Sequence, residues 1–161
     1  MTKQWYVLHV LTGSELEAHR QLKAQDIDSL VVQETCMIRR GGRWHEETRI
    51  LFPGYVFVYM KYTVDMHYVI KGVTGAIRLL PKDSPPQPLP VKEAVWLLDI
   101  CGQVLTPSMV DFNGDKPVVV DGPLKLLEEH ITKFDRHRRR AQLRIPVLGE
   151  GKDITLSILP V

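Results

Sequence analysis

The stretch Leu51-Phe52-Pro53-Gly54-Tyr55-Val56-Phe57-Val58 places a turn dipeptide, Pro-Gly, directly before a run of aromatic and β-branched residues. Such a run predicts a strand, here over Tyr55 to Met60, because these side chains pack well on a pleated surface. On its own, a run of this kind is typical of any central core strand. The neighbouring elements decide which fold it belongs to.

The segments before this stretch predict two strands, a helix and a hairpin. Trp5 to Val10 is a continuous apolar run and predicts a buried strand, and a helix is expected from Glu15. Leu30 to Ile38 predicts a second strand. Gly41-Gly42 favours a tight hairpin turn, after which Trp44 to Leu51 would form the return strand.

The segments after it predict two further helices and one more strand. Val64 to Lys71 is expected to form a short helix and Ala76 to Leu80 a strand. Pro81 to Pro90 is rich in proline, which removes backbone donors and excludes a helix or an interior strand. Val91 to Ile100 predicts a terminal helix, and the irregular composition of Gly102 to Asn113 favours a linker.

The remaining residues, Gly114 to Val161, suffice for a small barrel. Val118 to Val120 precedes an Asp-Gly-Pro turn, and apolar residues alternate with polar ones over 141–147 and 154–158, which predicts strands with one exposed face. Gly149-Glu150-Gly151-Lys152 fits a hairpin turn between them. Leu124, Leu127, Ile131 and Phe134 stand at helical spacing, so that stretch favours a helix by pattern alone.

Composition narrows the class of function. The chain has 161 residues, a net charge of +2 and no apolar run near the roughly 18 residues that span a bilayer. Two distant cysteines, Cys36 and Cys101, predict no disulfide framework and favour the cytoplasm. We find no catalytic motif and expect no enzyme activity and no cofactor. Cys36, His45, His67 and Cys101 lack the local pairing of zinc ligands, so no metal site is expected.

Two motifs in order resemble one family. Trp5-Tyr6-Val7, the Gly-Gly hairpin and Phe52-Pro53-Gly54-Tyr55-Val56-Phe57-Val58 together resemble the N-terminal domain of the NusG family of transcription elongation factors. Val119-Val120-Asp121-Gly122-Pro123-Leu124 looks like the opening of a KOW element. The resemblance implies an α+β N-terminal domain with a four-stranded, mostly antiparallel sheet (1–101), a linker (102–113) and an SH3-like β-barrel (114–161).

The resemblance also implies that RNA polymerase is the partner of a monomeric adaptor. Family members bind the clamp helices of the β′ subunit through an aromatic-lined concave patch, and the matching positions here are Tyr6, Phe52, Pro53, Tyr55 and Phe57. Strand alternation allows only some of them to face outward, and the competing reading places all of them in the core. A contact with the β-subunit gate loop is implied for Met66, His67 and Tyr68, although His67 is equally consistent with an ordinary surface histidine.

Departures from the family pattern resemble a specialised paralogue. Glu129 stands where the KOW element usually has glycine, and the barrel carries a basic run that resembles antiterminators of the LoaP group, some of which bind a hairpin in nascent RNA. Six cations against one acid give 133–144 a net charge of +5. The candidate RNA-binding residues are Lys133, Arg136, His137, Arg138, Arg139, Arg140 and Arg144. The alternative for such a run is a solvated charged hairpin.

Three other possibilities stay open at this point. The paralogue group resembling RfaH reads non-template DNA with basic residues on the first strand–turn–helix, but 10–17 is apolar or acidic here, leaving only His19 and Arg20. Those proteins also refold their C-terminal domain between helices and a barrel, whereas the Asp-Gly-Pro turn and alternating strands favour a permanent barrel. The alternative function is a KOW-containing RNA-binding protein of the translation machinery, which usually carries a larger basic excess.

Overall fold

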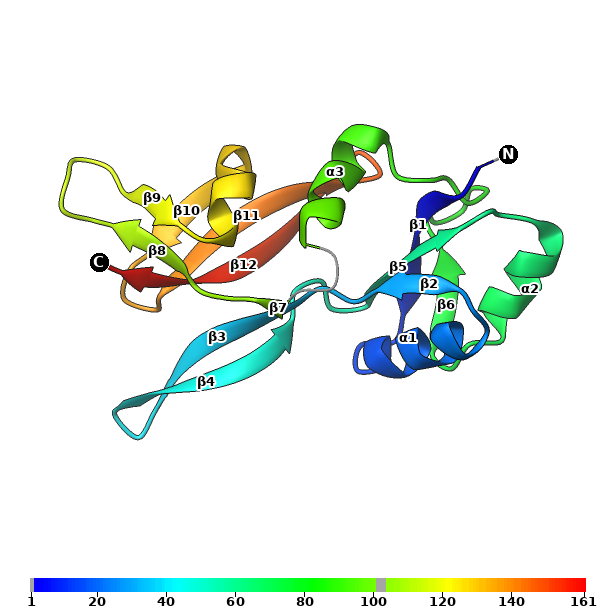
Figure 1. Cartoon of the computed structure of the whole chain (residues 1–161), viewed down its shortest axis with the longest axis horizontal. Coiled ribbons are helices and arrows are strands. Elements are labelled where there is room, and N and C mark those ends of the chain that lie inside the picture. The colour runs from blue at the N-terminus through cyan, green and yellow to red at the C-terminus, as the bar shows by residue number, and fades with distance from the viewer. Residues whose placement is uncertain (1, 101–103) are drawn as a thin grey trace. The chain divides into compact units, whose positions relative to one another are not determined.

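The computed structural model describes residues 2–100 and 104–161. They form two compact units, shown in Figure 1. Unit 1 comprises Met1–Val31 and Phe52–Cys101, and unit 2 comprises Val32–Leu51 and Gly102–Val161. The boundaries expected from the sequence, at 101 and 114, divide the chain differently, and independent folding of those two parts stays a prediction. Cys101 and the first two residues of the expected linker lie outside the described residues.

Unit 1 is an antiparallel sheet covered by helices. Its strand order is β2-β5-β1-β6. The strands are β1 (Gln4–Val10), β2 (Asp28–Leu30), β5 (Tyr55–Met60) and β6 (Ala76–Leu79), and the helices are α1 (Glu15–Ala24), α2 (Val64–Lys71) and α3 (Val91–Ile100). The two central strands supply the fully buried Val7, Leu8, Val56 and Val58, as their apolar runs predict.

The turn that precedes β5 is held against the end of β1. Gly54 has φ +83°, a left-handed conformation that glycine adopts without strain, and its carbonyl accepts a 2.8 Å hydrogen bond from the Val10 amide. A Cβ at Gly54 would lie 3.3 Å from the Val10 carbonyl oxygen. Pro53-Gly54 therefore forms a turn that leads directly into the central strand β5.

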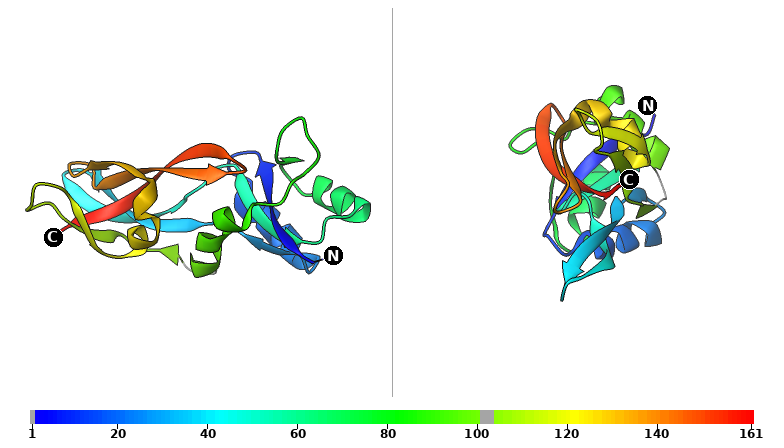
Figure 2. Two further views of the ribbon diagram at one scale, coloured as in Figure 1. Left: turned by 90° about the horizontal axis from the view of Figure 1, so that it is seen from above. Right: turned by 90° about the vertical axis from the view of Figure 1, so that its left-hand side faces the viewer.

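Unit 2 combines the Gly-Gly hairpin with the C-terminal strands. The hairpin strands are β3 (Gln33–Arg40) and β4 (Arg43–Ile50), joined by Gly41 and Gly42, both with positive φ. A five-stranded sheet follows in the order β10-β11-β12-β8-β9. Its strands are β8 (Ser108–Asp111), β9 (Val118–Asp121), β10 (Ile131–Asp135), β11 (Arg140–Val147) and β12 (Glu150–Pro160). The long β11–β12 pair bends over its length, as Figure 2 shows in orange and red.

The expected fold class is confirmed: an α+β N-terminal part and a small C-terminal β half-barrel. Two local expectations, one strand and one helix, are corrected, and the expected linker stays a prediction. The predicted strand over Leu30 to Ile38 is two strands, β2 and β3, in different sheets. The expected linker contains β7 (Val104–Leu105), which pairs in parallel with β3, and β8. The helix favoured from Leu124 is a 3₁₀ helix, η1 (Pro123–His130), followed by β10. No described helix is long and apolar enough to cross a membrane.

Candidate functional site

One face of the sheet in unit 1 carries a row of partly exposed aromatic side chains. On neighbouring strands β1 and β5, Trp5 lies opposite Tyr59 with ring centroids 5.1 Å apart, and His9 lies opposite Tyr55 at 6.0 Å. All four side chains are half-buried. We call Trp5, His9, Tyr55 and Tyr59 the aromatic face. Partly exposed aromatic clusters of this kind are the usual anchors of protein interfaces.

Phe57 lies between those two pairs but is covered. It is opposite Val7 in the register and only 1% exposed, because Trp96 of α3 meets its ring edge to face at 6.2 Å. Phe52, also 1% exposed, stacks on Trp96 at 5.4 Å. The indole Nε1 of Trp96 is buried and has no hydrogen-bond partner among the described residues. Phe52 and Phe57 are therefore core residues in this structure.

Of the positions matched to the polymerase patch, only two reach the surface. Tyr6 is buried on the opposite side of the sheet, where its ring lies 5.7 Å from Tyr62, because strand alternation turns it away from Trp5. Tyr55 is half-buried and Pro53 is exposed. Sequence reasoning missed Trp5 and Tyr59, although Tyr59 shares the two-residue period of Tyr55 and could have been found from it.

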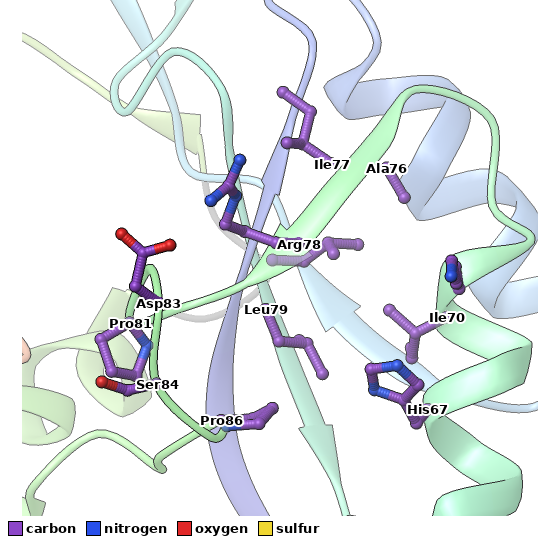
Figure 3. A pocket seen from close by; sticks show the side chains of 12 residues that line it. His67, Ile70, Ala76, Ile77, Arg78, Leu79, Pro81, Asp83, Ser84 and Pro86 are labelled. Carbon is purple, nitrogen blue, oxygen red and sulfur yellow. The ribbon is translucent and has the colours of Figure 1, made fainter.

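The three residues matched to the gate-loop contact lie on α2, where Met66 and His67 are half-buried and Tyr68 is exposed. Thr63 caps this helix, since its hydroxyl accepts a 3.1 Å hydrogen bond from the Met66 amide. His67 Nδ1 lies 3.0 Å from the Tyr62 hydroxyl, and the ring borders a cavity of about 470 Å³ between α2, β6 and the proline-rich loop (Figure 3). Tyr68 is 67% exposed and does not line that cavity.

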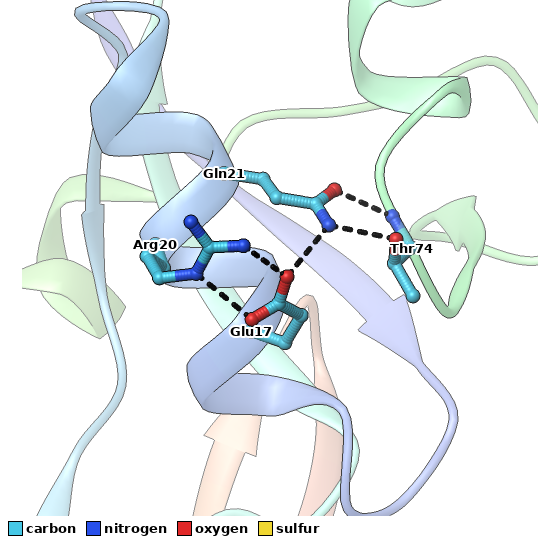
Figure 4. Close-up of polar contacts among 4 residues, drawn as sticks. All are labelled: Glu17, Arg20, Gln21 and Thr74. Atoms are coloured by element: carbon cyan, nitrogen blue, oxygen red, sulfur yellow. Dashed lines mark hydrogen bonds and ion pairs between the residues drawn. The ribbon is translucent and has the colours of Figure 1, made fainter.

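His19 and Arg20, the two residues on α1 that the sequence left as candidates for DNA contact, both have side-chain partners. Arg20 forms an ion pair with Glu17, which in turn accepts a 2.9 Å hydrogen bond from Gln21, and Gln21 bonds Thr74 twice (Figure 4). Hydrogen bonds from Arg20 and then Gln21 lower the pKa of Glu17 to about 2. His19 Nδ1 lies 2.7 Å from the Ser29 hydroxyl, and burial lowers the pKa of this imidazole, with a smaller contribution from Lys23.

The basic run forms the end of β10, a turn and the start of β11. Its members differ in exposure. Lys133, Arg136, His137, Arg138 and Arg144 are exposed, whereas Arg139 and Arg140 are half-buried. Arg144 forms a 3.0 Å ion pair with Asp153 on the neighbouring strand β12. In the turn, Asp135 accepts a 3.0 Å hydrogen bond from the Arg138 amide, which fixes the backbone beneath the exposed arginines.

The two half-buried arginines contact the β3–β4 hairpin. Arg140 forms a 2.8 Å ion pair with Glu34, whose other oxygen accepts a 3.0 Å hydrogen bond from the Ser157 amide. The guanidinium of Arg139 lies 4.0 Å from the centroid of the Trp44 ring, a cation–π distance. The seven residues of the basic run are thus neither all solvated nor all equally available to a ligand, because Arg140 belongs to the interior of unit 2.

The chain thus belongs to the class of α+β proteins with two compact units, one with an aromatic sheet face and one a small β half-barrel with an arginine-rich turn. The family model described as "Transcription termination factor nusG" matches residues 3–97. The chain therefore belongs to the NusG family.

Relatives and a solved structure extend that likeness over nearly the whole chain. The transcription termination/antitermination protein NusG of Bacillus subtilis is 28% identical, covering 100% of this chain and 98% of its own. The protein of the same name from Thermus thermophilus is 24% identical over the same shares. The structure titled "Domain interaction in Thermotoga maritima NusG" has 21% identity and a TM-score of 0.56, covering 98% of this chain and 95% of its own.

Proposed function

We propose that this chain is a transcription elongation and antitermination factor that binds RNA polymerase through unit 1. The aromatic face is the observation that carries the proposal, since it offers four partly exposed aromatic side chains on a rigid sheet. The names of the relatives, transcription termination/antitermination protein NusG, support the same process. A role in the translation machinery, the alternative from the sequence, is not favoured by those names.

Within this proposal, the aromatic face takes the clamp helices of the β′ subunit. Tyr55 and Pro53 remain from the residues matched by resemblance, and Trp5 and Tyr59 extend the surface along both central strands. Tyr68, exposed on α2, is the best placed of its motif to reach the β-subunit gate loop. Contact with both jaws would favour the closed clamp and so processive transcription. Such a factor works in the cytoplasm as a monomer.

The second part of the proposal is that unit 2 binds nascent RNA, as a specialised antiterminator resembling the LoaP group. The exposed Arg136, His137 and Arg138 lie on one hydrogen-bonded turn and supply charge and stacking groups for a phosphate backbone. Recruitment through non-template DNA is disfavoured, because both His19 and Arg20 are engaged within unit 1. The division into 1–101, a linker over 102–113 and 114–161 stays a prediction, and it competes with a division in which the β3–β4 hairpin belongs with the C-terminal strands. NMR relaxation of the full chain would distinguish the two divisions.

Polymerase binding tests the first part directly. Replacing both Trp5 and Tyr55 with alanine should cost about 2 kcal/mol or more of affinity for purified core polymerase, since buried aromatic anchors dominate interfaces. Leu16→Ala, at an exposed apolar position on α1, is the matched control and should bind as the wild type does. Unchanged affinity of a folded Trp5→Ala, Tyr55→Ala variant would remove the adaptor proposal.

A further inference from the structure

Two neighbouring cavities of unit 2 share a wall made by both the β3–β4 hairpin and the arginine-rich turn. Their volumes are about 540 and 570 Å³, and Arg39, Trp44 and His137 line both. The first is completed by Arg136, Arg139 and Pro160, and the second by Met37, Ile38, Arg49, Arg138, Arg140 and Thr155. None of the described residues that line them is acidic. The two cavities form one groove that suits an anion.

An aromatic ring stands among these cations. Trp44 is half-buried, with the guanidinium of Arg139 at 4.0 Å from its centroid and that of Arg39, its cross-strand partner, at 5.8 Å. A guanidinium beside an indole offers planar groups on which a nucleobase can stack, and guanidinium N–H groups pair with phosphate oxygens. An acidic peptide would pair with the arginines but would have no group that stacks on the Trp44 ring.

Arg139 occupies a backbone conformation that favours glycine. Its φ is +55°, in the left-handed region where a side chain costs free energy. The backbone is fixed there, since its amide donates to the Arg136 carbonyl at 3.2 Å and its carbonyl accepts from the Ile158 amide at 3.0 Å. A non-glycine residue in such a position is a reason to look for a function of its side chain.

We propose that this groove binds single-stranded RNA, with an unpaired base stacked at the Trp44–Arg139 pair and its flanking phosphates held by Arg39 and Arg136. An unpaired strand is favoured over a duplex, because the bases of an A-form helix are already stacked and its deep groove excludes side chains. The inference rests on the RNA-binding part of the proposed function. It adds the β3–β4 hairpin as half of the site and the unpaired nucleotide as its ligand.

The test uses the full chain and a fluorescein-labelled single-stranded RNA dodecamer of mixed sequence, alone or annealed to its complement, with binding followed by anisotropy. Trp44→Leu should weaken single-strand binding about tenfold with an unchanged salt slope, because it removes stacking and no charge. Arg39→Gln should reduce the slope of log affinity against log salt by about 0.7, the value for one phosphate contact on a single strand. Arg40→Gln is the matched control, since Arg40 pairs with Glu47 and lines neither cavity.

A further variant separates binding from folding. Arg139→Gly removes the stacking side chain at a position where the backbone favours glycine, so the fold should be retained while single-strand affinity falls about tenfold. Wild-type affinity in both Arg139→Gly and Arg39→Gln would overturn the proposal. Equal or tighter binding of the duplex would overturn the assignment of an unpaired ligand, as would competition by a glutamate dodecamer as strong as that by unlabelled RNA.

These results are distinguishable from failure of the polymerase proposal. Each variant is also measured against purified core polymerase without RNA, where no change is expected because the substitutions lie outside the aromatic face. Loss of RNA binding with intact polymerase binding is the expected pattern. RNA binding that survives all three substitutions while the Trp5 and Tyr55 substitutions abolish polymerase binding would overturn the groove and leave the adaptor function standing.

Discussion

The Arg140 guanidinium lies 2.8 Å from the Glu34 carboxylate, joining β11 to a residue 106 positions earlier in the β3–β4 hairpin. The two side chains are only 13% and 4% exposed. Because the Ser157 amide bonds the same carboxylate, the pair links three strands of unit 2. Arg140, which the sequence suggests as one of several phosphate ligands, is therefore part of the interior of unit 2. A charge-reversing substitution of Arg140 would change the stability of the fold as well as any RNA binding.

Loss of Arg140 should destabilise unit 2. Arg140→Gln leaves the Glu34 carboxylate buried without its counter-ion, which typically costs about 3 kcal/mol or more at neutral pH. Glu34→Gln should cost less, because a neutral amide retains an oxygen for the Ser157 amide and removes a buried charge. Urea denaturation gives both free energies of unfolding. An equal or smaller loss for Arg140→Gln would contradict the assigned role of the pair.

The same carboxyl should make stability depend on pH. Burial raises the pKa of Glu34 above its ordinary value of 4.5, partly opposed by the Ser157 amide and by Arg140. The folded chain then holds this proton more tightly than the unfolded chain, so the contribution to stability is fully present below about pH 4.5 and is lost as the pH rises through the folded pKa.

Measured as a difference between two chains, this effect has a defined sign. The free energy of unfolding of the wild type should fall relative to that of Glu34→Gln between about pH 4 and about pH 7, because only the wild type titrates at this position. Urea denaturation across that range measures it, with the carbon chemical shift of the Glu34 carboxyl as an independent titration. If the wild type instead became more stable relative to Glu34→Gln as the pH rises, the pKa of Glu34 would be lowered in the folded chain.

Gly122, in the Asp-Gly-Pro turn, should not tolerate a side chain. Its φ is +107°, and a Cβ there would lie 2.6 Å from the Cα of Ser108. Gly122→Ala is expected to cost more than about 2 kcal/mol, since left-handed strain and a backbone clash add. Gly41→Ala is the control: its φ is also positive, but a Cβ there meets nothing within 4 Å. Thermal denaturation of both variants compares them, and equal losses would show that conformational strain alone governs Gly122.

Glu15 should hold together the two turns that flank the central strands of unit 1. Glu15 is 1% exposed, and its carboxylate accepts 2.7 Å hydrogen bonds from the Gly13 and Gly54 amides. Glu15→Ala should cost about 2 to 4 kcal/mol, because two donors lose their partner. Glu17→Ala, on the exposed side of the same helix, should change the melting temperature little. Equal melting temperatures for the two variants would contradict this.

Local sequence patterns predicted several elements correctly, and one local pattern predicted the wrong element. Tyr55–Met60, Val64–Lys71 and Val91–Ile100 have the predicted bounds, since alternation, helical spacing and flanking proline or glycine act over neighbouring residues. The spacing of Leu124 and Leu127 does place both in the core, but within a 3₁₀ helix. The rest of that pattern, Ile131 and Phe134, pairs with β11 instead, because strand partners outweigh local propensity.

By itself, the sequence determined β5, α2, α3, the hairpin turn at Gly41-Gly42 and membership of the family, because turn chemistry and hydrophobic periodicity are local properties. Only the tertiary structure decided which candidate residues a partner can reach. Trp96, 39 positions later in the chain, covers Phe57 and removes it from the surface. Arg139, also distant from the hairpin in the sequence, packs against the ring of Trp44. Exposure depends on what packs against a side chain, and its neighbours here come from distant parts of the chain that no local pattern specifies.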